Sequence, residues 1–181
     1  MEIMLVNKET IMISPDRMKE LAENEVLKTV KSRVGYKMLI ENITDETILQ
    51  KLDEILIELA FNPDKYGLVD VTEAFMSIPT YKAIRDCVIS KHSTIVDCGC
   101  GTGLQQLLFH DMNYIGIDCF NNYFEITGNF EHGLIEDILP TLELDSQVYL
   151  ISVFCGKYFN NVKEVMIKKA QELKYCGLII L

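Results

Sequence analysis

The feature that most constrains the fold is a glycine-rich segment between an apolar run and a helical pattern. Residues 94–96 predict a short strand, glycines follow at positions 99, 101 and 103, and residues 104–110 predict a helix. Glycine is needed where the backbone turns sharply or where a ligand approaches it closely. The segment therefore predicts a strand-to-helix turn at the carboxyl end of a strand, where α/β proteins bind ligands.

Strand and helix patterns alternate after this turn. Residues 114–117, 133–135, 148–154 and 177–181 predict further strands, and residues 162–173 predict a helix. This alternation predicts an α/β fold with a Rossmann-like, mainly parallel sheet of about five strands flanked by helices.

The part of the chain before this sheet predicts helices. Residues 1–90 form a predicted helical region, and residues 91–181 form the predicted α/β domain. A helix is expected to start at Ser14 and to break at Gly35, and a second is expected to start at Asp45. A third is expected over residues 80–90, opened by the proline at 79.

Two short apolar runs at the N-terminus predict a hairpin. They cover residues 3–6 and 10–13 and are separated by three polar residues. The pattern is that of two strands joined by a short turn.

An acidic residue follows the second predicted strand of the α/β domain. Asp118 lies nineteen positions after Gly99, where a carboxylate can accept hydrogen bonds from both ribose hydroxyls. A dinucleotide fingerprint requires glycine at position 104, where the chain has Leu104, and the Gly-Lys-Ser/Thr of a P-loop is absent. A purely structural turn in another α/β fold remains the alternative.

Residues 97–103, which read Asp-Cys-Gly-Cys-Gly-Thr-Gly, resemble motif I of the class I S-adenosylmethionine (SAM) dependent methyltransferases. Residues 114–118 resemble the second motif of that family, and residues 136–140 resemble its acidic loop after strand three. The resemblance covers about residues 80–181.

This resemblance implies that SAM is the cofactor. It implies that three glycines hold the methionine moiety: Gly99, Gly101 and Gly103. Asp97 would lie near the methionine ammonium, and Asp118 would bind the ribose. Cys119 and Phe120 would lie beside the adenine, and Asp137 would face its amino group.

The implied activity is methyl transfer to a small-molecule or protein acceptor. No catalytic residue is assigned, because residues 152–157 lack the Asn/Asp-Pro-Pro-Tyr pattern of enzymes that methylate base amino groups. Methyl transfer from an activated sulfonium needs mainly proximity and alignment. Acceptor contacts are expected within residues 60–85. Two alternatives stay open: a non-catalytic SAM-binding or assembly module, and a truncated fragment of a longer methyltransferase.

The sheet of this family has seven strands, whereas the chain ends at the fifth. Residues 178–181 would form an uncovered apolar edge, which invites pairing with another strand. Three explanations are open: a truncated chain, a homo-oligomer that forms through this edge, or addition of the 3–13 hairpin to the sheet.

Composition narrows the partners. The net charge of −10, from 17 basic and 27 acidic residues, argues against nucleic acid and anionic membranes. No run of about 18 apolar residues predicts a membrane span. The six cysteines lack the density of a disulfide scaffold and predict reduced thiols in the cytoplasm, and the three scattered histidines predict no metal site.

Overall fold

The computed structural model describes residues 2–4, 10–12, 20, 23–62, 68–88, 92–121, 123–124, 126, 128–144, 147–153 and 161–181. The predicted helix start at Ser14 and the loop at residues 154–157 lie outside the described residues. The predicted boundary near residue 91 falls between two described elements, and residues 89–91 are also outside the description.

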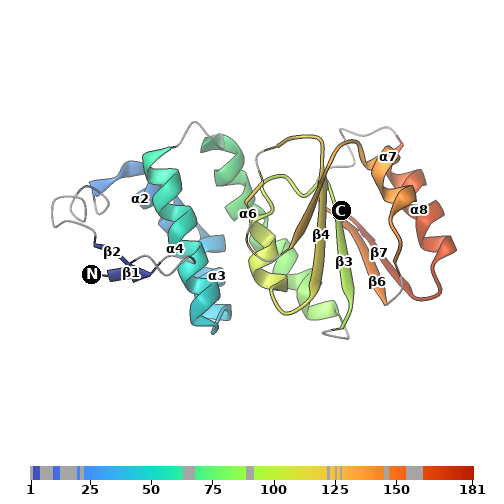
Figure 1. The fold of residues 1–181 in the computed structure, drawn as a ribbon, viewed down its shortest axis with the longest axis horizontal. Coiled ribbons are helices and arrows are strands. Elements are labelled where there is room, and N and C mark those ends of the chain that lie inside the picture. Colours follow the sequence, from blue (N-terminus) through green and yellow to red (C-terminus); the bar gives the residue numbers. More distant parts are fainter. Residues whose placement is uncertain are drawn as a thin grey trace.

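A five-stranded, all-parallel sheet lies at the centre of the C-terminal half (Figure 1). Its strands, in chain order, are β3 (Thr94–Cys98), β4 (Asn113–Asp118), β5 (Asn129–His132), β6 (Val148–Ser152) and β7 (Cys176–Ile180). Their order across the sheet is β5-β4-β3-β6-β7. The chain therefore proceeds in one direction from β3 to β5 and in the other from β6 to β7. The predicted Rossmann-like α/β fold is confirmed, and the strand order reverses between β3 and β6.

Helices cover both faces of this sheet. One face carries α6 (Leu68–Cys87) and the 3-10 helix η1 (Leu104–Phe109). The other carries α7 (Ile135–Ile138), the 3-10 turn η2 (Leu139–Thr141) and α8 (Val162–Glu172). Within the described ranges, no helix combines the length and apolar character needed to cross a bilayer.

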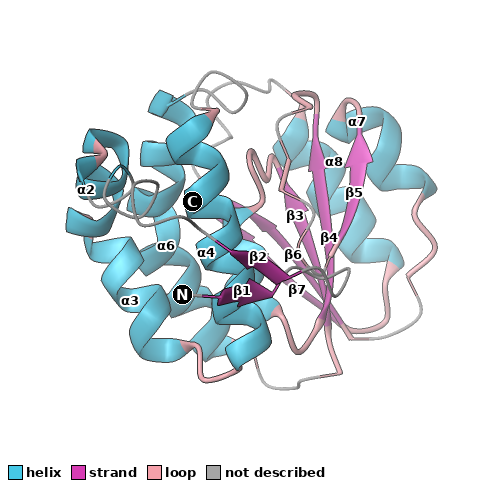
Figure 2. Cartoon of the chain, turned by 60° about the vertical axis from the view of Figure 1, so that its left-hand side comes forward, coloured by secondary structure: helices cyan, strands magenta, loops and turns pink. Residues whose placement is uncertain are grey.

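Three further helices form a layer beyond α6: α2 (Glu25–Ser32), α3 (Val34–Asn42) and α4 (Glu46–Phe61) (Figure 2). Asp45 starts α4 as predicted, because its Oδ1 accepts hydrogen bonds from the amides of Thr47 and Ile48. The predicted N-terminal helices are present in this layer.

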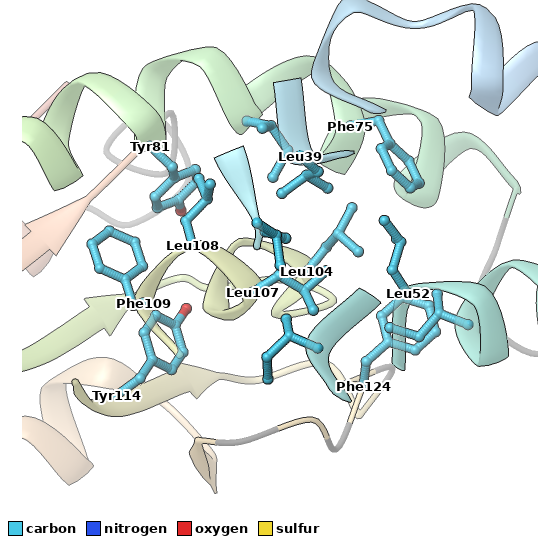
Figure 3. Packing of buried hydrophobic residues seen from close by; sticks show 14 of the residues in the cluster. Leu39, Leu52, Phe75, Tyr81, Leu104, Leu107, Leu108, Phe109, Tyr114 and Phe124 are labelled. Carbon is cyan, nitrogen blue, oxygen red and sulfur yellow. The ribbon is translucent and has the colours of Figure 1, made fainter. Parts of the chain in front are cut away.

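One hydrophobic core joins this helical layer to the sheet. Figure 3 shows Leu104 and Leu107 of η1 lying between Leu39 and Phe75 of the helices and Tyr114 of the sheet. Each fully buried leucine stabilises the fold by about 1.5–3 kcal/mol relative to an exposed one. The helical region and the sheet are thus packed as one structure through η1.

The N-terminal hairpin forms, but it does not extend the sheet. Strands β1 (Glu2–Met4) and β2 (Thr10–Met12) pair antiparallel, as predicted. They make a separate two-stranded sheet, and β7 pairs with β6 alone among the described strands. The hypothesis that this hairpin adds to β7 is therefore wrong for the described residues.

The third strand of the sheet lies earlier than its predicted position. It covers Asn129–His132 rather than residues 133–135. Gly133, with φ 154°, follows the strand, and Ile135 begins α7 and is buried against the sheet. The apolar run belongs to the helix, whereas the edge strand is largely exposed and polar.

Two helix boundaries also differ from the sequence prediction. The proline at 79 lies inside α6 rather than at its start, because Phe75 and Ile78 before it are completely buried. The break near residue 34 falls at Arg33, and Gly35 lies inside α3. Tertiary packing outweighs the local helix signals at both places.

Gly35 and Pro79 belong to the same contact between α3 and α6. Pro79 has no amide hydrogen to donate to the carbonyl of Phe75, four residues earlier. Gly35 lies directly against this carbonyl, and a Cβ added to Gly35 would overlap the Phe75 oxygen. The missing side chain therefore permits the close approach of the two helices.

Gly35→Ala should destabilise the protein by about 1–3 kcal/mol, because the new methyl group overlaps backbone. Helix propensity alone predicts the opposite sign, a gain of about 0.5–1 kcal/mol. Urea unfolding of both proteins distinguishes the two. Ile40→Ala, at an exposed position on the same helix, is the control and should change stability little. A stabilised Gly35→Ala variant would contradict the packing.

Candidate functional site

The glycine loop, residues 99–103, follows β3 at the point where the strand order reverses. All three glycines have left-handed backbones, with φ of 84° at Gly99, 56° at Gly101 and 71° at Gly103. Gly101 is exposed, and a Cβ added there would meet open space. A Cβ at Gly103 would overlap the ring of Tyr123. The backbone of Gly101 is therefore open to solvent, whereas Gly103 serves internal packing.

Asp118 lies at the end of β4, against this loop. Its Oδ2 accepts a hydrogen bond from the amide of Gly101 at 2.7 Å, and its Oδ1 accepts one from the amide of Phe120 at 2.9 Å. The residue is only 5% exposed. A carboxylate has about four acceptor positions, so these two bonds do not use all of them. Asp118, the residue predicted to bind ribose, thus lies against the predicted glycine loop.

Asp97, before the loop, is fully buried and bound by the protein itself. Tyr81 Oη of α6 donates to its Oδ1 at 3.2 Å. Tyr114 Oη and Gln105 Nε2 both donate to its Oδ2 at 2.6 Å. The predicted contact with a methionine ammonium stays a prediction, and it would require this enclosed network to open.

Burial raises the pKa of Asp97 to about 6, because the charged carboxylate loses its hydration. The hydrogen bonds from Tyr114, Gln105 and Tyr81 lower the pKa, and the nearby charge of Asp118 raises it further. Burial and the charge of Asp97 also raise the pKa of the Tyr114 hydroxyl. The tyrosine therefore stays a hydrogen-bond donor to the carboxylate.

Gln106 is a residue of this region that the sequence prediction missed. Its Nε2 donates to the carbonyls of Gly103 and Phe124, and its Oε1 accepts from the amide of Gly128. It thereby fastens the chain after β4 onto the glycine loop. The signal in the sequence is the amide pair at 105–106 inside an otherwise apolar helix.

The predicted adenine contacts lie where β4 and β5 end. The amide of Gly133 donates to the carbonyl of Asp118, and His132 Nε2 donates to the carbonyl of Cys119. Burial, more than the charge of Asp118, raises the pKa of the Cys119 thiol. Phe120 is 69% exposed. A flat apolar ligand placed beside Asp118 could therefore pack against the exposed Phe120 ring.

The remaining predicted site residue, Asp137, lies on α7 and is exposed. Two hydroxyls near the loop are candidates that the sequence did not indicate. Thr102 and Ser152 are buried, and neither hydroxyl has a hydrogen-bond partner among the described residues. A polar ligand group would satisfy such a buried atom.

No family model, no curated protein and no solved structure matches the chain.

Gly101→Ala and Gly103→Ala should separate the two roles within the loop. A left-handed backbone costs a residue with a side chain about 1–2 kcal/mol, so both variants should be less stable. Gly103→Ala should lose more, because its methyl group also meets the ring of Tyr123. Urea unfolding gives both values. Equal losses would contradict the inward placement of Gly103.

The buried carboxylate also predicts a pH dependence of stability. The pKa of Asp97 is about 6 in the folded chain and 3.8 in the reference state. Between these values the folded chain holds a proton that the unfolded chain has released. Asp97 therefore contributes fully to the free energy of unfolding below pH 4. About 3 kcal/mol of this free energy is lost as the pH rises from 4 through 6.

Unfolding free energies measured from pH 4 to pH 7 test this dependence. The free energy of unfolding of Asp97→Asn should not fall between pH 4 and pH 7. The difference in this free energy between the variant and the wild type should therefore change across the range. Asp86→Asn, which removes an exposed carboxylate from α6, is the control and should keep the wild-type profile. Parallel profiles for wild type and Asp97→Asn would show that Asp97 does not titrate there.

Proposed function

We propose that the chain binds SAM over the glycine loop and transfers its methyl group to a small-molecule or protein acceptor. The observation that carries the proposal is the pairing of the exposed, left-handed Gly101 with the buried carboxylate of Asp118 at the strand-order reversal. A loop of this kind admits a ligand close to the backbone, and the carboxylate supplies acceptors for a ribose.

Charge favours SAM over a dinucleotide. SAM carries a sulfonium and an ammonium, whereas a dinucleotide carries an anionic pyrophosphate. Residues 93–181 contain 11 acidic and 5 basic residues, and the last arginine of the chain is Arg85. No guanidinium is therefore present in this half to bind a pyrophosphate. The acidic half instead suits a cationic ligand.

The chemistry asks little of the protein beyond placement. The sulfonium is an activated methyl donor, so a site that aligns donor and acceptor can be sufficient. We propose a reducing, cytoplasmic setting, because the six cysteines of the chain lack the density of a disulfide scaffold. We expect acceptor contacts from within residues 60–85, as the family resemblance implies.

Calorimetric titration with SAM, S-adenosylhomocysteine and NAD tests the proposal. The wild type should bind the first two and not the third. Asp118→Ala should weaken binding roughly tenfold to a hundredfold, because it removes charge-assisted hydrogen bonds to the ribose. Glu131→Ala, which removes an exposed carboxylate from the neighbouring β5, is the charge-matched control and should bind normally.

Unfolding of Asp118→Ala should be followed in parallel, because this variant also loses the bond to the Gly101 amide. Absence of SAM binding by the wild type would refute the proposal. Binding followed by transfer of labelled methyl groups to cell-extract components would establish the enzyme. Binding without transfer would favour the non-catalytic SAM-binding module.

A further inference from the structure

One peptide group of the glycine loop is held at both of its ends. The carbonyl of Cys100 accepts a hydrogen bond from Gln105 Nε2 at 2.8 Å and one from the amide of Gly103 at 3.0 Å. The amide of Gly101, in the same peptide group, donates to Asp118 Oδ2. Rotation of this peptide would break the bonds on both sides. Its orientation decides which backbone atoms the exposed loop presents to a ligand.

The side chain that holds this carbonyl is itself part of the Asp97 network. Gln105 Nε2 lies 2.6 Å from Asp97 Oδ2, and Tyr81 Oη of α6 lies 3.2 Å from Asp97 Oδ1. A continuous path of buried hydrogen bonds therefore runs from α6 through Asp97 to the Cys100–Gly101 peptide. Nothing in this path needs to touch the ligand.

We infer that Gln105, which holds the Cys100 carbonyl directly, and Tyr81, which acts through Asp97, are positioning residues. Together they fix the Cys100–Gly101 peptide and couple ligand binding to the protonation of a buried carboxylate. The inference deepens the proposed function, and only its SAM-binding part rests on that proposal. The loop geometry can be tested without any ligand.

Protonation of Asp97 changes what the network can do. The carboxylate accepts three hydrogen bonds, whereas the neutral acid must donate one and keeps fewer acceptor positions. The tyrosine hydroxyls can turn to accept this proton, whereas the Gln105 atom that faces Asp97, Nε2, can only donate. The bond from Gln105 to Asp97 therefore weakens, and Gln105 becomes free to leave the Cys100 carbonyl.

The titratable groups around Asp97 come from three directions. Tyr81 faces it from α6, Tyr114 and Asp118 belong to β4, and Cys100 of the loop lies near Tyr114. On the side of β6, its partner in the strand register is the apolar Ile151. With burial as the main cause, the pKa of Asp97 is about 6, so the coupling falls within an accessible range of pH.

The test is a pH titration of the unliganded protein by ¹⁵N–¹H NMR. The backbone amide of Gly101 and the side-chain amide of Gln105 should share an inflection near pH 6. Asp97→Asn should remove the inflection. Tyr81→Phe, which loses only one oxygen, should move it upward, because the tyrosine hydrogen bond stabilises the charged carboxylate.

Tyr149→Phe is the matched control. It also removes a buried hydroxyl on the same face of the sheet, but that hydroxyl is bound to Gln147. It should leave the inflection unchanged. His132 lies beside Asp118 in the strand register, so His132→Asn is a second control. An inflection that persists in Asp97→Asn and disappears in His132→Asn would overturn the inference, as would the absence of any inflection at Gly101.

SAM titrations extend the test. At pH 7, Tyr81→Phe should bind SAM roughly threefold to tenfold more weakly than the wild type, and Tyr149→Phe should bind normally. The wild type should bind more weakly at pH 5 than at pH 7, and Asp97→Asn should lose this difference. If SAM does not bind at all while the NMR responses appear, the cofactor proposal fails and the positioning role stands. If SAM binds but Gly101 does not respond to Asp97, the inference alone fails.

Discussion

The structure depends on how a central strand accommodates a carboxylate. β3 is buried along its whole length, and its neighbours β4 and β6 occupy both of its edges. One of its faces carries Val96 and Cys98 into an apolar core, and the other carries Asp97. A buried charge is tolerated only when hydrogen bonds replace its hydration. The donors come from α6, β4 and η1, so this requirement fixes three elements relative to one strand.

The same elements carry the apolar packing. Gln105 of η1 donates a hydrogen bond to the carboxylate of Asp97. Leu104 and Leu107, which lie one turn of η1 apart, pack into the core that is shared with the helical layer. The polar contacts of Gln105 and the apolar packing of Leu104 and Leu107, which Figure 3 shows, thus both hold η1 in place. The conformation of the glycine loop that precedes η1 is restricted, because β3 fixes its start and η1 fixes its end. The left-handed backbone of its glycines follows from this short connection.

Much of the sheet was predictable from the sequence. Apolar runs bounded by polar residues mark β3, β4, β6 and β7, and the helix cap at Asp45 marks α4. The failures share one cause. β5 is an exposed edge strand without an apolar run, and the proline inside α6 imitates a helix start. At Gly35, a residue that suggests a break instead permits a close contact between helices. In each case a neighbour distant in sequence outweighs the local preference.

The sequence by itself determined that a strand, a glycine turn and a helix follow one another, and that an acidic residue ends the next strand. It did so because turns and strand ends need particular residues whatever surrounds them. Only the tertiary structure decided that Asp118 holds the amide of Gly101, and that Asp97 faces protein donors inside the core. It also decided that Tyr81 is buried against Asp97. These pairings join residues up to 24 positions apart, since Gln105 also reaches Tyr81. Such contacts form only after packing has brought the elements together, so local sequence preferences do not predict them.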